Sequence, residues 1–261
     1  MLNLQETAQK ASQWVRETGA LQIKMFGKKD LRVDSKSTGY ELLTEVDELS
    51  EKYLLEAIGE AYPEHAILAE ESGATRQESD FLWVVDPLDG TTNYARGIPI
   101  FVISVALRHK GETVLGLVYN PLLDEMFSAV KGNGAYLNGS RIQVSIRETL
   151  REAVLATGFP YDKATHPDNN ANYVAHFVPR VRGLRRMGAA AYDLACVAAG
   201  RLDGYWEINL GAWDVEAGNL LVTEAGGEII LLPERRQVSL IAGNRIICSE
   251  IFEEIKKVDS T

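Results

Sequence analysis

The chain has 261 residues, of which 46% are hydrophobic and 25% are charged, and its formal net charge is −10. These proportions are typical of a globular protein and exclude a disordered chain. The acidic balance provides no long-range basic field for nucleic acid, and the length suits one large domain or two small ones.

The sequence also excludes several classes of protein. Two cysteines, Cys196 and Cys248, are too few for a disulfide framework or a thiolate zinc site. The N-terminal MLNLQETAQK has neither the basic nor the apolar region of a signal peptide. The longest nearly apolar run, residues 98–107, is shorter than the ~18–20 residues of a membrane span. We therefore expect a soluble, cytoplasmic α/β protein with no membrane partner.

The first half is predicted to form helices followed by a mostly meandering sheet. Apolar residues recur at helical spacing over 4–26 and 45–61. Short β-like runs separated by turn residues follow at 65–69, 81–85, 100–107, 113–121 and 125–130.

In the second half, strands and helices alternate. Strands are predicted at 153–159, 202–208, 228–232 and 238–242, and helices at 190–200, 215–227 and from Asn244 onward. Such alternation predicts a second α/β unit. We expect an N-terminal α+β lobe at 1–148 and a C-terminal α/β lobe at 149–261.

The segment WVVDPLDGTTNY, residues 83–94, carries two aspartates at the end of a predicted buried strand. Pro87 cannot extend the ladder, so the strand is expected to end at Asp86. Asp86 and Asp89 lie three residues apart across a predicted tight turn, so both carboxylates can face one cleft. The same turn leaves the carbonyl of Leu88 free to bind a cation.

The residues that follow suit a phosphate. Gly90 permits a close approach of the backbone, and the amides of Thr91 and Thr92 could hold a phosphate as a helix N-terminus does. The alternative is an Asx turn followed by a helix cap, with no chemistry.

More carboxylates are predicted to join this cleft. Glu70 and Glu71 follow a strand, and because neighbouring strand residues face opposite sides, only one of the two should enter. Asp214 stands at the start of a predicted helix. Hard oxygen donors with no paired histidines favour Mg²⁺ over zinc.

Thr44 and Asp47 have two interpretations. Thr-x-x-Asp before a helical segment fits an N-terminal capping box, which explains both residues without catalysis. A role beside the acidic cleft is the alternative for Asp47.

Four separated segments resemble the inositol monophosphatase family: AEESG (69–73), DPLDGTTNY (86–94), TGFPY (157–161) and WDVEAGNLLVTEAGG (213–227). The similarity extends over essentially the whole chain. It implies an αβαβα sandwich of the inositol monophosphatase and fructose bisphosphatase type. It further implies a homodimeric, lithium-sensitive phosphomonoesterase with two or three Mg²⁺ per active site.

The resemblance assigns the metal ligands residue by residue. Glu70, Asp86 and the Leu88 carbonyl would hold the first metal, and Asp86, Asp89 and Asp214 the second.

It also assigns substrate and water contacts. The attacking water would be oriented or activated by Glu70, Thr91 and Asp47. The substrate-binding positions are Gly90, Thr91, Ala190, Glu207 and Asp214. Two residues depart from the family pattern: Glu41, where Asp is common, and Ala189, where Ser or Thr is common. The second weakens the substrate assignment.

Rival interpretations remain open. The segment LDGT partly resembles the nucleophile motif of haloacid dehalogenases, although two residues separate the aspartates instead of one. A regulatory binding protein that retains a metal site is a second rival, supported by the basic segment from Arg180 to Arg186. Inositol monophosphate is the favoured substrate, with fructose bisphosphate and other sugar or polyol phosphates as alternatives.

Overall fold

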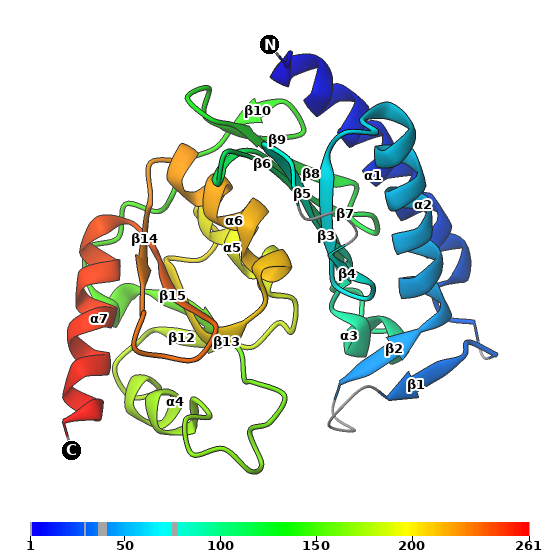
Figure 1. Ribbon diagram of the computed structural model, residues 1–261. Coiled ribbons are helices and arrows are strands. Elements are labelled where there is room, and N and C mark those ends of the chain that lie inside the picture. Colours follow the sequence, from blue (N-terminus) through cyan, green and yellow to red (C-terminus); the bar gives the residue numbers. More distant parts are fainter. Residues whose placement is uncertain (1, 29, 36–40, 75–77, 261) are drawn as a thin grey trace.

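The chain forms five layers in the order helix, sheet, helix, sheet, helix (Figure 1). The computed structural model describes residues 2–28, 30–35, 41–74 and 78–260. The predicted αβαβα sandwich is confirmed. The division into lobes at residue 148 stays a prediction.

The first outer layer consists of α1 (Leu4–Met25) and α2 (Glu45–Ala61), which cover one face of the larger sheet (Figure 1). Their helical periodicity buries Val15 and Leu54 against strand residues such as Trp83 and Leu115.

The larger sheet has eight strands in the order β10-β9-β8-β7-β6-β5-β3-β4. Their bounds are β3 (Ala66–Ala69), β4 (Gly73–Ala74), β5 (Phe81–Asp89), β6 (Val102–His109), β7 (Glu112–Asn120), β8 (Glu125–Val130), β9 (Ala135–Leu137) and β10 (Ser140–Arg141). The pair β3–β5 is parallel and the other neighbours are antiparallel, as expected of a meander.

The predicted end of the strand at Asp86 was wrong. β5 continues to Asp89, and its pairing with β6 is irregular between Asp86, opposite Ser104, and Asp89, opposite Val102. Pro87 has no N–H to donate and is accommodated in this bulge. The two aspartates therefore stand on a bulged strand end instead of a tight turn.

The central layer consists of α5 (Ala190–Ala198) and α6 (Ala212–Glu224), between the two sheets. Both helices are apolar around much of their circumference because both faces are covered. At Gly116 of β7, an added Cβ would lie 2.8 Å from the carbonyl oxygen of Ala217 in α6. The helix backbone thus rests directly on the strand.

The second sheet has five strands in the order β12-β11-β13-β15-β14. They are β11 (Val154–Thr157), β12 (Gly183–Arg185), β13 (Gly204–Leu210), β14 (Glu228–Leu231) and β15 (Val238–Gly243). Its outer face is covered by α4 (Ala171–Phe177) and α7 (Arg245–Asp259), with Phe177 and Ile251 in the same apolar cluster as Trp206.

Several short elements were not predicted: the hairpin of β1 (Val33–Ser35) and β2 (Leu42–Thr44), the helix α3 (Thr91–Ala95), and the elements β4, β9, β10, α4 and β12. Most of them are too short to show a hydrophobic period. No helix in the described part of the chain has the length and apolar character needed to cross a bilayer.

Candidate active site

Carboxylates from separate segments of the chain line one cavity of about 340 Å³. Glu70 follows β3, Asp86 and Asp89 lie on the bulged end of β5, and Asp214 lies in the first turn of α6. Leu88, Gly90 and Thr91 line the same cavity. Of the adjacent pair of glutamates, Glu70 is a lining residue and Glu71 is not, as strand alternation suggested.

The bulge of β5 is fixed by hydrogen bonds from three sides. Leu88 N donates to Asp86 Oδ1 at 3.0 Å, and Glu70 N donates to the Val85 carbonyl at 3.1 Å. The buried Gln22 of α1 donates from Nε2 to the Pro87 carbonyl at 2.7 Å. Gln22 was not predicted, and its only signal in the sequence is a polar residue on the buried face of the first helix.

The other two aspartates are held by the starts of the central helices. Ala190 N and Ala191 N at the beginning of α5 donate to Asp89 Oδ1 and Oδ2, at 3.2 and 2.7 Å. Gly211 N donates to Asp214 Oδ2 at 2.6 Å, so the Asp214 carboxylate caps the start of α6. Both carboxylates are thus oriented by backbone groups.

Burial and mutual repulsion raise the pKa values of these carboxyls. Burial is the largest cause for Asp86, Asp89 and Asp214, and the neighbouring carboxylates, Glu70 among them, add to it. The pKa of Asp89 rises to about 7. Among the described residues that line the cavity, none is a lysine, arginine or histidine.

The donor set suits a hard divalent cation. Carboxylate oxygens and a backbone carbonyl are the ligands that Mg²⁺ prefers, and soft sulfur and imidazole donors are absent from the described lining. Within residues 2–28, 30–35, 41–74 and 78–260, however, no three His, Cys, Asp or Glu side chains are already gathered as a metal site. The assignment to Mg²⁺ therefore depends on the chemical type of the donors, and their side chains would have to move closer together when the ion binds.

Thr91 and Asp47 form a buried pair at the edge of the cavity. Thr91 Oγ1 lies 2.9 Å from Asp47 Oδ1 and 3.1 Å from the Leu88 carbonyl oxygen. The other Asp47 oxygen accepts hydrogen bonds from the backbone N–H and the hydroxyl of Thr44. Burial raises the pKa of Asp47 to about 6, although these hydrogen bonds favour the ionised form. The capping box is therefore present, and the same carboxylate also contacts Thr91.

Glu207 and Ala190 line a second, smaller cavity of about 80 Å³ that adjoins the first. Tyr205 donates to Glu207 Oε2 at 2.5 Å, and a Cβ on Gly158 would overlap the Glu207 carboxylate. Burial raises the pKa of Glu207 to about 7. A glycine at 158 is thus what lets this carboxylate enter the cavity.

We expect Asp214→Asn to weaken Mg²⁺ binding with little loss of stability. Asparagine keeps an oxygen that can accept from Gly211 N, but it removes one negative charge from the cluster. Asp214→Ala should also lose the cap, at ~0.5–2 kcal/mol. Thermal unfolding with and without Mg²⁺ measures both effects. If Asp214→Asn lowers stability but leaves the Mg²⁺ dependence unchanged, Asp214 is only a cap.

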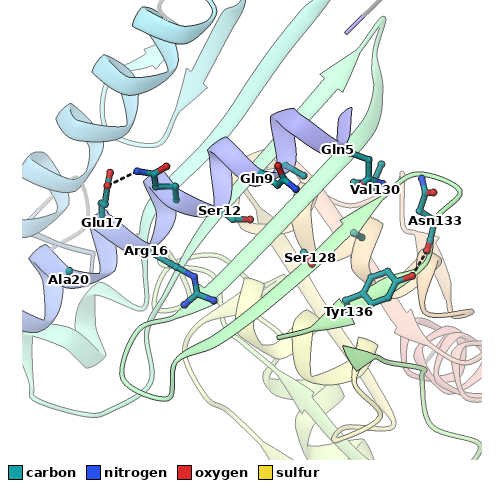
Figure 2. A pocket seen from close by; sticks show the side chains of 13 residues that line it. Gln5, Gln9, Ser12, Arg16, Glu17, Ala20, Ser128, Val130, Asn133 and Tyr136 are labelled. Atoms are coloured by element: carbon teal, nitrogen blue, oxygen red, sulfur yellow. Dashed lines mark hydrogen bonds between the residues drawn. The ribbon is translucent and has the colours of Figure 1, made fainter. Parts of the chain in front are cut away.

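A cavity of about 620 Å³ lies elsewhere, between α1 and the β8–β9 hairpin (Figure 2). Its lining combines small apolar side chains with amides, hydroxyls and two charged side chains. Arg16 pairs with Asp124 at 2.6 Å, and Glu17 accepts a hydrogen bond from Gln13 at 3.0 Å. None of the predicted site residues lies there, so the smaller acidic cavity is the candidate active site.

The chain is similar to proteins of known family. Residues 3–258 match the model of the inositol monophosphatase family. An inositol-1-monophosphatase of Mesorhizobium japonicum is 39% identical over 238 residues, covering 89% of each chain. A protein of Pasteurella multocida named Nus factor SuhB is 44% identical over 214 residues, covering 81% of this chain and 80% of its own.

The structure of inositol monophosphatase from Anabaena superposes with a TM-score of 0.86 at 36% identity, covering 98% of this chain and 97% of that one. The order of the layers, the acidic cavity and these similarities agree, and the chain belongs to the inositol monophosphatase family.

Proposed function

We propose that this protein hydrolyses a phosphate monoester in the presence of Mg²⁺ and that inositol monophosphate is its substrate. Family membership supports phosphatase activity. The observation that carries the proposal is the carboxylate cluster, in which Asp86 and Asp89 are buried, beside the Thr91–Asp47 pair. Such a cluster is unfavourable by itself and is explained by a function that brings positive charge to it.

The proposed ligands follow the two groups of the family pattern. Glu70, Asp86 and the Leu88 carbonyl would hold one Mg²⁺, and Asp86, Asp89 and Asp214 another, with a third left open. Bound Mg²⁺ supplies positive charge that offsets the charge of the reacting phosphate and acidifies water.

The chain itself would position the reactants. The Thr91 hydroxyl has a single proton, and both of its observed neighbours are acceptors. Its remaining lone pairs can therefore accept from a water, which Glu70 would hold from another side. Backbone amides of Gly90 and Thr91 would bind the phosphate. Glu207, with Ala190 beside it, would accept hydrogen bonds from substrate hydroxyls.

The release of phosphate from inositol 1-phosphate tests this proposal. The wild-type protein should release phosphate with Mg²⁺, and Asp89→Asn should be strongly impaired while remaining folded by circular dichroism. Equal rates for the two proteins would show that the acidic cluster does not carry the activity.

A regulatory binding role is the second candidate, because one similar protein is named a Nus factor. This role predicts no Mg²⁺-dependent phosphate release from any monoester tested. A panel of inositol 1-phosphate, fructose 1,6-bisphosphate and other sugar or polyol phosphates therefore separates the two candidates and ranks the substrates.

Two further features of the family are part of the proposal. We infer a homodimer, which light scattering coupled to size exclusion tests directly. The cytoplasmic location also stays a prediction, and fractionation of cells that express the protein with its native ends would test it.

Lithium should inhibit the reaction. Li⁺ is close to Mg²⁺ in size and carries half its charge, so it can compete for a small pocket of carboxylate oxygens, whereas Na⁺ is larger. Inhibition should weaken as Mg²⁺ is raised. NaCl at equal concentration controls for ionic screening, which is the same for both salts. Superimposable rate curves in LiCl and NaCl at several Mg²⁺ concentrations would contradict this expectation.

A further inference from the structure

The arginines from Arg180 to Arg186 do not form one basic surface. Arg180 lies 3.5 Å from Glu254 of α7, and Arg185 donates to the neighbouring Leu184 carbonyl. Arg182 is exposed and lines neither cavity of the site. Arg186, in contrast, lines the small cavity that contains Glu207. One residue of the segment is thus placed at the site.

The small cavity continues from the acidic one. Both are lined by Asp89, Tyr161, Asn209 and Asp214. A phosphate at the acidic cluster would therefore direct the rest of its molecule toward Glu207 and Arg186. Arg186 is the one basic residue among the described residues that line the small cavity.

The backbone near Arg186 is fixed relative to the acidic cluster. Asn93 Nδ2 of α3 donates to the carbonyls of Met187 and Ile100, each at 2.8 Å. The Asp89 carboxylate binds the next residues through Ala190 N and Ala191 N. The guanidinium rests against Gly188, where an added Cβ would lie 2.5 Å from Arg186 Nη1. The position of this backbone segment relative to the cluster is therefore a property of the fold, and it places the guanidinium at the small cavity.

The guanidinium is available to a ligand. Within the described part of the chain it forms no hydrogen bond or ion pair, whereas Arg201 pairs with Glu125 and Arg235 with Asp259. The positive charge of Arg186 nevertheless affects two buried carboxyl groups. Burial raises the pKa values of Glu207 and Asp193, and the Arg186 charge lowers both.

We propose that Arg186 binds a second anionic group on the leaving alcohol of the substrate. On this proposal, which rests on the proposed function, sugar or polyol phosphates that carry a second phosphate are substrates in addition to inositol monophosphate, and their second phosphate adds to their affinity. Glu207 would accept a hydrogen bond from a hydroxyl of the same molecule. A guanidinium can bind a phosphate through two parallel N–H groups, which gives geometric selectivity as well as affinity.

Two substrates that differ only in the second phosphate test the proposal: fructose 1,6-bisphosphate and fructose 1-phosphate, with release of the 1-phosphate measured at fixed ionic strength. In the wild type, kcat/KM should be about 10- to 100-fold higher for the bisphosphate, as expected of one charge-assisted contact. Arg186→Gln should remove most of this preference, mainly through KM. Arg182→Gln, an exposed arginine four residues earlier, should retain it.

The possible outcomes separate the proposal from its alternatives. If Arg186→Gln lowers kcat/KM for both sugars equally, the arginine only moderates the acidic potential of the site, and the proposal is wrong. A wild-type preference for the monophosphate also overturns it. No Mg²⁺-dependent release from either sugar or from inositol 1-phosphate would instead contradict the proposed function.

A binding measurement does not depend on turnover. Calorimetry in the Glu70→Gln background should show tighter binding of the bisphosphate than of the monophosphate, and adding Arg186→Gln should abolish the difference. Equal affinities in the Glu70→Gln protein would overturn the proposal even if hydrolysis is never observed.

Discussion

Glu70→Gln should suppress phosphate release by ~10²–10⁴-fold, the contribution typical of a positioned acid–base group. The substitution preserves the size of the side chain but removes a negative charge from the acidic cavity that Glu70 lines. The substitution should therefore weaken both the proposed first metal site and the proposed contact to the attacking water. Initial rates over a range of Mg²⁺ concentrations, with melting temperature as the check on folding, measure the effect.

Glu71→Gln is the matched control for this variant. Glu71 is the same residue type one position later, and it does not line the acidic cavity. Its rate should stay within about twofold of the wild type, because Glu71 lies outside the proposed sets of metal ligands and substrate contacts. A Glu70→Gln protein that turns over at the wild-type rate with Mg²⁺ bound would remove Glu70 from the mechanism.

Asp86→Asn should have opposite effects on activity and on metal-free stability. Asp86 is proposed to bind both metals, so its loss should abolish detectable turnover. Without Mg²⁺, however, the variant relieves repulsion in a buried cluster, and its amide can still accept from Leu88 N. A gain of on the order of 1 kcal/mol would raise the melting temperature by ~2–4 °C.

The response to Mg²⁺ distinguishes this account from a general packing effect. A ligand at 100 times its Kd stabilises a fold by ~2.7 kcal/mol, so the wild type should melt higher with Mg²⁺ and Asp86→Asn should not. Asp193→Asn is the control. Asp193 is also buried with a raised pKa, and its Oδ1 has no hydrogen-bond partner among the described residues, but it lies outside the proposed ligand set. A lost Mg²⁺ response in Asp193→Asn would show that the effect is not specific to the ligands.

Local patterns predicted the fold well where the elements are long. The helices at 4–25 and 45–61 and the strands of the meander have clear periods, and tertiary packing did not alter them. The end of β5 was mispredicted because the rule for proline describes a regular ladder, whereas a bulge accommodates Pro87. The hairpin of β1 and β2 has three residues per strand and therefore no readable period.

For the site, the sequence motifs indicated which carboxylates converge, because the cluster is built from local segments at strand and helix ends. The residues that orient the cluster were not predictable in the same way. Gln22 reaches Pro87 from 65 positions away, and the placement of Arg186 depends on Asn93 and on the start of α5. Such contacts arise only when the layers are assembled.

The contact at Gly116 couples the thickness of the central layer to the chemistry of the metal site. Asp86 and Asp89 belong to a sheet, and Asp214 belongs to a helix laid on that sheet, so the separation of these carboxylates is the distance between two layers. The absence of a side chain at Gly116 sets that distance, since even one methyl group there would meet the backbone of α6 at Ala217. A larger residue at this buried strand position would therefore change the affinity of the site for metal, although every proposed ligand would stay the same.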